Sequence, residues 1–247
     1  MKLTSTARTL LLVALFAIAM GYLESAVVIY IRAIYYPEGF AFPMKIISQQ
    51  LMITEFWREV ATIIMLLGIA LIAAKTPIAR FAFFIYAFAI WDIFYYVFLY
   101  LLIGWPQSLL TWDVLFFIPT TWIGPVIAPV INSFTMIGLA LVILFTRPSK
   151  TPFKLGWFVW TLLIEGSVII IISYTHEYFS FMLLRFSFGQ IISSSNAPEQ
   201  LQYATSYIPQ HFPWFVFMLG QMIHLLAIGF ILKRVRKAFA VVNGVNS

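Results

Sequence analysis

Cysteine is absent from this chain of 247 residues, and charged residues are few. Without cysteine there are no disulfides, no thiolate zinc sites, no cysteine-ligated iron–sulfur clusters and no c-type haem attachment. Asp, Glu, Lys and Arg make up 10% of the residues, whereas soluble domains contain about 25%. Hydrophobic residues reach 62%. This composition excludes a soluble globular domain and a disordered chain, and it is typical of a polytopic membrane protein.

Acidic residues are the scarcer charge, with nine Asp and Glu against 15 Lys and Arg, which gives a formal net charge of +6. In a soluble protein this excess would suggest nucleic acid as a partner. Here the basic residues gather beside apolar segments, as they do on the cytoplasmic side of membrane proteins. Eleven of the 15 lie on one predicted side: Lys2, Arg8, Lys75, Arg80, Arg147, Lys150, Lys154, Lys233, Arg234, Arg236 and Lys237. We therefore predict contact with membrane lipid and no nucleic-acid partner.

Six apolar stretches are long enough to cross a bilayer as helices, which requires about 20 residues each. They run near residues 9–33, 51–74, 81–104, 126–146, 155–174 and 213–232. Their continuous apolar character lacks the alternation of a membrane β-barrel. The sequence predicts an all-α, polytopic membrane protein with six transmembrane helices in a single domain, residues 1–247.

The distribution of charge also predicts the orientation. No acidic residue lies in the loops that hold the basic residues, whereas Glu38, Asp113 and Glu199 lie in loops on the other side. The positive-inside rule then predicts that both termini lie in the cytoplasm. We expect the membrane to be the cytoplasmic membrane of a bacterium or archaeon. The first segment resembles a signal peptide, but its cleavage would leave the apolar stretch 26–36 outside the membrane, so we expect it to remain.

Two long loops, 104–125 and 178–212, are predicted on the outer side. The first is apolar but rich in proline and too short for another span, and its three tryptophans suit the membrane interface. There we expect a short helix lying on the outer leaflet or dipping into it. In the second loop, the apolar stretch 178–192 is expected to continue the fifth helix or to lie at the interface.

Ionisable residues occur inside the spans, although each costs about 2.5–3.5 kcal/mol at the centre of a membrane helix. Glu55, Arg58 and Glu59 share one helical face, as do Asp92 and Tyr96. Most of these groups lie in the outer half of the bilayer, above an apolar inner half. We predict one polar cavity shared by Glu24, Glu55, Arg58, Glu59, Asp92 and Glu165, with Arg58 and Arg32 pairing with the acids and His224 approaching the cavity floor. The candidate ligand-binding or proton-active residues are Glu24, Arg32, Glu55, Arg58, Glu59, Asp92, Tyr96, Glu165 and His224.

Motifs that would identify a cofactor are missing. His176, Glu177 and His211 flank the second outer loop as candidate metal ligands, but their spacing is not diagnostic of a site. The chain has no phosphate-binding glycine loop, zinc-protease helix or nucleophile elbow. It also lacks Gly-x-x-x-Gly in the spans, so Gly220 has no partner for a helix-dimerisation face. The cofactor and the question of enzymatic activity stay open.

The hypothesis that this pattern favours is a binding protein or membrane-embedded complex subunit with an outward-facing acidic pocket. The pocket would take a lipid-soluble molecule, such as a quinone or polyprenyl lipid, or support a membrane or exported protein partner. One alternative is an intramembrane enzyme that uses the carboxylates on a lipidic substrate. Another is a proton-coupled small-molecule transporter, although the apolar inner half and the lack of an evident inverted repeat argue against transport.

Overall fold

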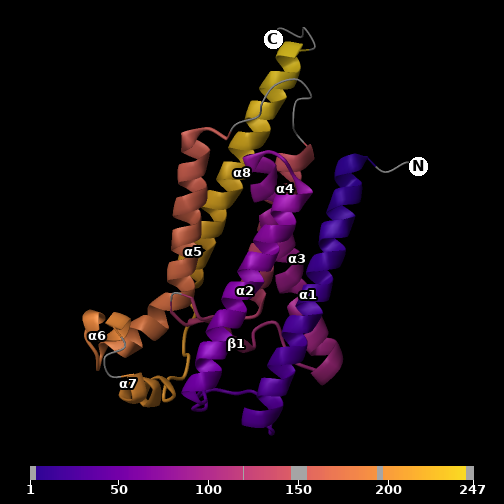
Figure 1. The fold of residues 1–247 in the computed structure, drawn as a ribbon. Helices are drawn as coiled ribbons and strands as arrows, with labels where there is room; N and C mark the ends of the chain where they lie inside the picture. The colour runs from indigo at the N-terminus through magenta and orange to yellow at the C-terminus, as the bar shows by residue number, and fades with distance from the viewer. Residues whose placement is uncertain (1–3, 119, 146–154, 194–196, 243–247) are drawn as a thin grey trace.

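The computed structural model describes residues 4–118, 120–145, 155–193 and 197–242. Six of its helices are long and apolar enough to cross a membrane, which confirms the predicted all-α polytopic fold (Figure 1). They are α1 (Ser5–Tyr35), α2 (Gln49–Ala73), α3 (Pro77–Ile103), α4 (Ile127–Phe145), α5 (Trp157–Leu183) and α8 (Trp214–Val242). The fifth span is longer than predicted, because α5 continues past residue 174 and so takes up the start of the second outer loop.

Local sequence signals set several helix ends. The side chains of Thr4 and Ser48 accept hydrogen bonds from the backbone N–H groups of Ala7 and Leu51, at 3.2 and 3.3 Å, and so cap the starts of α1 and α2. Helix α3 ends at Gly104, whose φ of 66° is the left-handed conformation that glycine adopts without strain. Capping therefore accounts for these ends of the helices.

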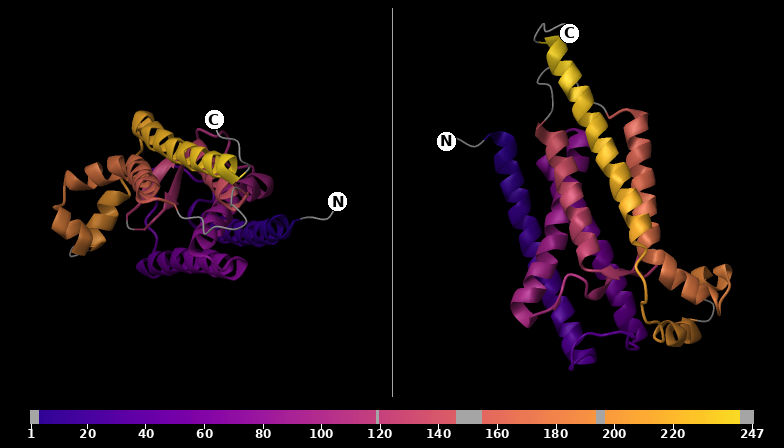
Figure 2. Two further views of the ribbon diagram at one scale, coloured as in Figure 1. Left: turned by 90° about the horizontal axis from the view of Figure 1, so that it is seen from above. Right: turned by 180° about the vertical axis from the view of Figure 1, so that it is seen from behind.

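Helix α3 lies at the centre of one half of the bundle, where it packs against α1, α2 and α4. Helix α8 packs against α5 and α4, which joins the two halves (Figure 2). Gly21 lets α1 approach α3 closely, since an added Cβ there would lie 3.1 Å from the carbonyl oxygen of Trp91. In the half of the bundle that contains the two chain ends, the core is apolar. Its fully buried residues include Val13, Leu66 and Ile143.

The loop 104–125, which was predicted on the outer side, contains a β-hairpin, so the predicted short helix is wrong. Strand β1 (Trp112–Phe116) pairs antiparallel with β2 (Trp122–Pro125), and Asp113 lies opposite Gly124. Aromatic and β-branched residues, which favour strands, are frequent in both segments. Strand pairing also satisfies backbone groups that would otherwise be unpaired in apolar surroundings. The hairpin packs against α5 and α4, and Val114, Leu115 and Phe116 of β1 line a cavity within the bundle.

The segment between α5 and α8 holds two short helices, α6 (Phe188–Ser193) and α7 (Ala197–Ala204), which lie to one side of the bundle. The N-terminal end of α1 and the C-terminal end of α8 lie at the same end of the bundle, away from α6 and α7 (Figure 1). Because the number of spans is even, the first and the last helix must have their chain ends on the same side of the bundle. Four of the basic residues used to predict the orientation, Lys2, Arg147, Lys150 and Lys154, lie outside the described residues.

Candidate functional site

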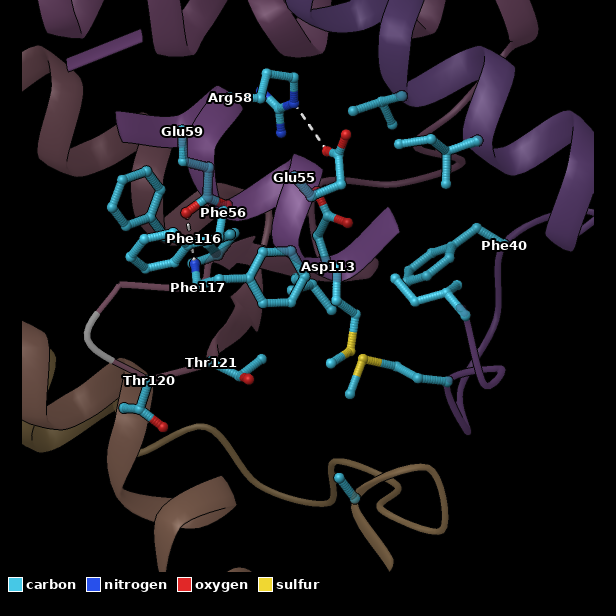
Figure 3. A pocket seen from close by; sticks show the side chains of 18 of the residues that line it. Phe40, Glu55, Phe56, Arg58, Glu59, Asp113, Phe116, Phe117, Thr120 and Thr121 are labelled. Atoms are coloured by element: carbon cyan, nitrogen blue, oxygen red, sulfur yellow. Dashed lines mark hydrogen bonds and ion pairs between the residues drawn. The ribbon is translucent and has the colours of Figure 1, made fainter. Parts of the chain in front are cut away.

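A cavity of about 680 Å³ is lined by residues from the half of the bundle away from the chain ends. Figure 3 shows side chains that line it. Its walls come from α1, the loop after α1, α2, α3, the β-hairpin, the end of α5, α6 and α7. Small-molecule sites have volumes of about 300–1,000 Å³ and mostly apolar walls. Phe56, Trp91, Phe116 and Met182 are among the apolar side chains that line this cavity. Its size and lining fall within the range of small-molecule sites.

The first polar group in the cavity wall centres on Arg58 of α2. Its guanidinium pairs with Glu24 of α1 and, through Nε, with Glu55 at 2.8 Å. The hydroxyl of Thr62 lies 3.5 Å from the second carboxylate oxygen of Glu24. Since α1 and α2 contact each other much less than either contacts α3, this ion pair is a principal link between them. Arg58 thus pairs with acidic residues, as the sequence pattern predicted.

Glu59 and Asp92 line the same cavity but have no cationic partner among the described residues. One carboxylate oxygen of Glu59 accepts a hydrogen bond from the backbone N–H of Phe117 at 3.0 Å (Figure 3). The Ser133 hydroxyl of α4 donates to Asp92 of α3 at 2.7 Å. Each acid therefore has hydrogen-bonding capacity left for a ligand.

The second polar group joins α1, α3 and the hairpin. Arg32 lies 3.1 Å from a carboxylate oxygen of Asp113, and the Tyr96 hydroxyl donates to the other oxygen at 3.3 Å. The guanidinium also lies over the rings of Trp105 and Phe40, 3.8 and 4.5 Å from their centroids. Burial raises the pKa of Asp113 to about 6, although Arg32, the backbone N–H of Val114 and the Tyr96 hydroxyl each lower it.

Asp113 is a cavity residue that sequence reasoning missed, because it was placed in an outer loop. Only 1% of its surface is exposed. A signal was available, since Asp113 is the only ionisable residue between Gly104 and Pro125 in otherwise apolar and aromatic sequence. An isolated acid in such surroundings usually finds a buried partner. Arg32 pairs with this acid, and not with the glutamates that share Arg58.

Two predicted members of the cavity lie elsewhere. Glu165 is exposed on α5, and no hydrogen bond or ion pair to the described residues involves it. His224 is buried between α5 and α8, with Nε2 3.1 Å from the carbonyl oxygen of Leu163. Neither lines the cavity, so the predicted single site and the predicted cavity floor are wrong in these respects.

The crossing of α5 and α8 explains why Glu165 and His224 lie outside the cavity. Gly166 of α5 faces α8, and an added Cβ on Gly220 would lie 2.9 Å from the carbonyl oxygen of Gly166. The two glycines therefore let the helices approach closely, so Gly220 does have a small partner, on a different helix from its own. Because consecutive residues of a helix differ by about 100° in direction, Glu165 then points away from α8.

The candidate metal ligands do not form a site. Glu177 accepts hydrogen bonds from the Tyr207 hydroxyl at 2.8 Å and from the backbone N–H groups of Gln210 and His211 at 3.2 Å each. His176 and His211 are exposed. Within the part of the chain that the structure describes, no three His, Asp or Glu side chains gather as metal ligands would. Glu177 instead fastens the segment between α7 and α8 to the end of α5.

Comparison with known proteins finds no matching protein family, no matching curated protein and no matching solved structure. The function must therefore be inferred from the chemistry of the cavity itself. That chemistry combines apolar and aromatic walls with two arginines already paired to carboxylates. It adds two further carboxyl groups that pair with no cation among the described residues.

Proposed function

We propose that this chain is an integral membrane binding protein whose cavity holds a lipid-soluble ligand by its polar head group. The observation that carries the proposal is the composition of the cavity lining, in which many aromatic side chains lie together with Glu59, Asp92 and the ion-paired Arg58. An apolar ligand body would contact the aromatic side chains, and its head group would hydrogen-bond to the polar ones. The cavity would open on the outer side of a bacterial or archaeal cytoplasmic membrane, with both termini in the cytoplasm.

The charges favour a quinone over a polyprenyl phosphate. Five carboxyl groups line the cavity, from Glu24, Glu55, Glu59, Asp92 and Asp113, against three cations, Arg32, Lys45 and Arg58. Both arginines already pair with acids. A phosphate would add negative charge to this surplus, which is unfavourable in an apolar site. A neutral quinone carbonyl needs only hydrogen-bond donors, which a guanidinium or a protonated carboxyl group provides.

The other half of the bundle supports binding over transport. Its core contains Leu10, Leu66, Phe83 and Ile143, all buried and all apolar. Transport of a polar molecule across the membrane would need groups that solvate the molecule along the whole path through the bundle. The buried polar residues Glu55, Glu59 and Asp113 instead lie around the cavity in the opposite half.

Quinone binding to the purified protein tests the proposal. Decyl-ubiquinone titrated into detergent-solubilised protein should quench tryptophan fluorescence, since Trp57 and Trp91 line the cavity. The variant Glu59→Leu should bind about tenfold more weakly, a loss of about 1.4 kcal/mol, while Glu59→Gln, which can still donate a hydrogen bond, should bind nearly as well as the unchanged protein.

Glu165→Leu is the matched control, because it removes a carboxyl group that lies outside the cavity; its affinity for the quinone should be unchanged. Farnesyl phosphate provides the competing ligand class. If farnesyl phosphate displaced the quinone, or if the quinone bound Glu59→Leu as well as the unchanged protein, the quinone proposal would be lost.

A further inference from the structure

Glu165 is unusual among the ionisable residues of the spans. It lies eight residues into α5, about 12 Å along a helix of 27 residues, and its side chain is exposed. Six other charged residues of the spans, Glu24, Arg32, Glu55, Arg58, Glu59 and Asp92, line the cavity. Glu177, nearer the end of α5, accepts three hydrogen bonds. An exposed carboxyl group at this depth would face hydrocarbon, where its insertion is unfavourable. This position needs a polar partner that the described chain does not supply.

The residues around Glu165 form a regular seam along the face of α5 that is turned away from the rest of the bundle. Spacings of three and four residues alternate along it, through Phe158, Thr161, Glu165, Val168, Ile172, Thr175 and Phe179. This is the repeat by which helices pack side by side at a small crossing angle. All seven residues are exposed or half-buried, whereas α5 buries Leu163, Gly166 and Ile170 on its opposite side. Helix α5 lies at an edge of the bundle beside α8 (Figure 1). At the ends of the seam Phe158 contacts Phe230 of α8 and Phe179 contacts Phe188 of α6, whereas Glu165, Val168 and Ile172 between them are exposed.

We infer that this seam, defined by those seven residues, docks a transmembrane helix of a different protein that carries Lys or Arg at the depth of Glu165. A cation would pair with the carboxylate, and the β-branched residues of the seam would pack against the partner helix. A polar residue in an otherwise apolar seam also fixes the register of two helices. This surface is separate from the cavity and does not depend on the ligand proposed above.

A second copy of this chain fits the seam poorly. A two-fold contact would bring two Glu165 carboxyl groups together, and like charges in an apolar site oppose each other. The two arginines of the cavity wall, Arg32 and Arg58, are already paired to acids. Charge complementarity therefore points to a different chain.

Site-specific photo-crosslinking in native membranes tests the inference. A benzoylphenylalanine placed at Val168 or Ile172 keeps Glu165 intact, and the same probe at Ile72 on α2, which is 84% exposed, gives the control. Mass spectrometry should identify, from the α5 probes alone, a peptide from another protein that contains a membrane span with Lys or Arg. Crosslinks to a second copy of this chain, or to lipid only, would overturn the inference.

Charge exchange then tests the pair itself. Glu165→Leu should reduce the crosslinked product about tenfold, and Glu165→Lys should abolish it. Combining Glu165→Lys with a change of the partner's cation to Glu should restore the product. Undiminished crosslinking in Glu165→Leu would overturn the inference. Unfolding temperatures show whether each variant is folded, and Glu165→Leu should match the unchanged protein because its new side chain suits lipid. Glu59→Leu, which alters the cavity only, should crosslink normally, so a failure of the ligand proposal and a failure of the docking proposal are distinguishable.

Discussion

Arg32 of α1 lies 3.1 Å from Asp113 of β1, a residue 81 positions further along the chain. Both side chains are buried, with relative exposures of 9% and 2%. The pair fixes the hairpin against α1, and Tyr96 adds a bond from α3 to the same carboxylate. One wall of the cavity thus depends on a contact between segments that are far apart in sequence.

Removing one member of this pair should be strongly destabilising. Arg32→Ala would leave Asp113 buried without a cation, and breaking a buried pair in this way costs about 3–5 kcal/mol. The double variant Arg32→Met/Asp113→Leu should recover much of that loss, because no charge is left unpaired. Thermal unfolding in detergent measures both. Equal unfolding temperatures for Arg32→Ala and the unchanged protein would show that the pair contributes little.

The protonation of Asp113 should make stability depend on pH. Its pKa is about 6 in the folded protein, above the ordinary value of 3.8. The folded state therefore binds this proton more tightly than the unfolded state does. The resulting stabilisation is complete below about pH 4 and is lost as the pH rises through about 6.

The variant Asp113→Asn isolates this effect from other titrating groups. Between about pH 4 and pH 7, the unfolding temperature of the unchanged protein should fall relative to that of Asp113→Asn. The opposite trend would mean that attraction to Arg32 outweighs the burial of the carboxyl group.

The crossing of α5 and α8 should not tolerate a larger residue. A Cβ added at Gly166 would lie 2.5 Å from Cδ2 of His224 and 3.1 Å from the carbonyl oxygen of Gly220. Gly166→Ala should therefore destabilise the protein by about 1–3 kcal/mol. Gly138→Ala in α4 is the control: an added Cβ there meets nothing within 4 Å, so the higher helix propensity of alanine should leave stability unchanged or raise it. Equal effects of the two substitutions would show that the crossing can relax.

The proposed orientation can be tested by labelling, because the chain has no cysteine of its own. Glu199→Cys on α7 should react with a membrane-impermeant maleimide from outside intact cells, and Lys75→Cys between α2 and α3 only after the cells are opened. Among the residues that the structure describes, Glu199 pairs with Arg185 alone, and both side chains are exposed, so its loss should cost little stability. Labelling of the Glu199→Cys variant from the cytoplasmic side alone would reverse the orientation.

The sequence alone determined that the chain lies in a lipid bilayer, how many helices span the bilayer and which residues share a face within one helix. Hydropathy is a local property, so six apolar stretches were enough to predict six long helices. Helical periodicity likewise predicted that Glu55, Arg58 and Glu59 lie together. These inferences hold because each depends on residues close in the chain.

Only the tertiary structure decided which faces meet. Lipid is as apolar as a protein core, so an apolar helix such as α5 carries no hydropathy signal that separates its buried face from its lipid face. Glu165 was therefore assigned to the cavity, although the approach of Gly166 to Gly220 turns it outward. Asp113 was assigned to an outer loop for a related reason. Its burial depends on pairing with Arg32 and on a hairpin seated inside the bundle, and contacts over 81 residues leave no periodic trace in the sequence.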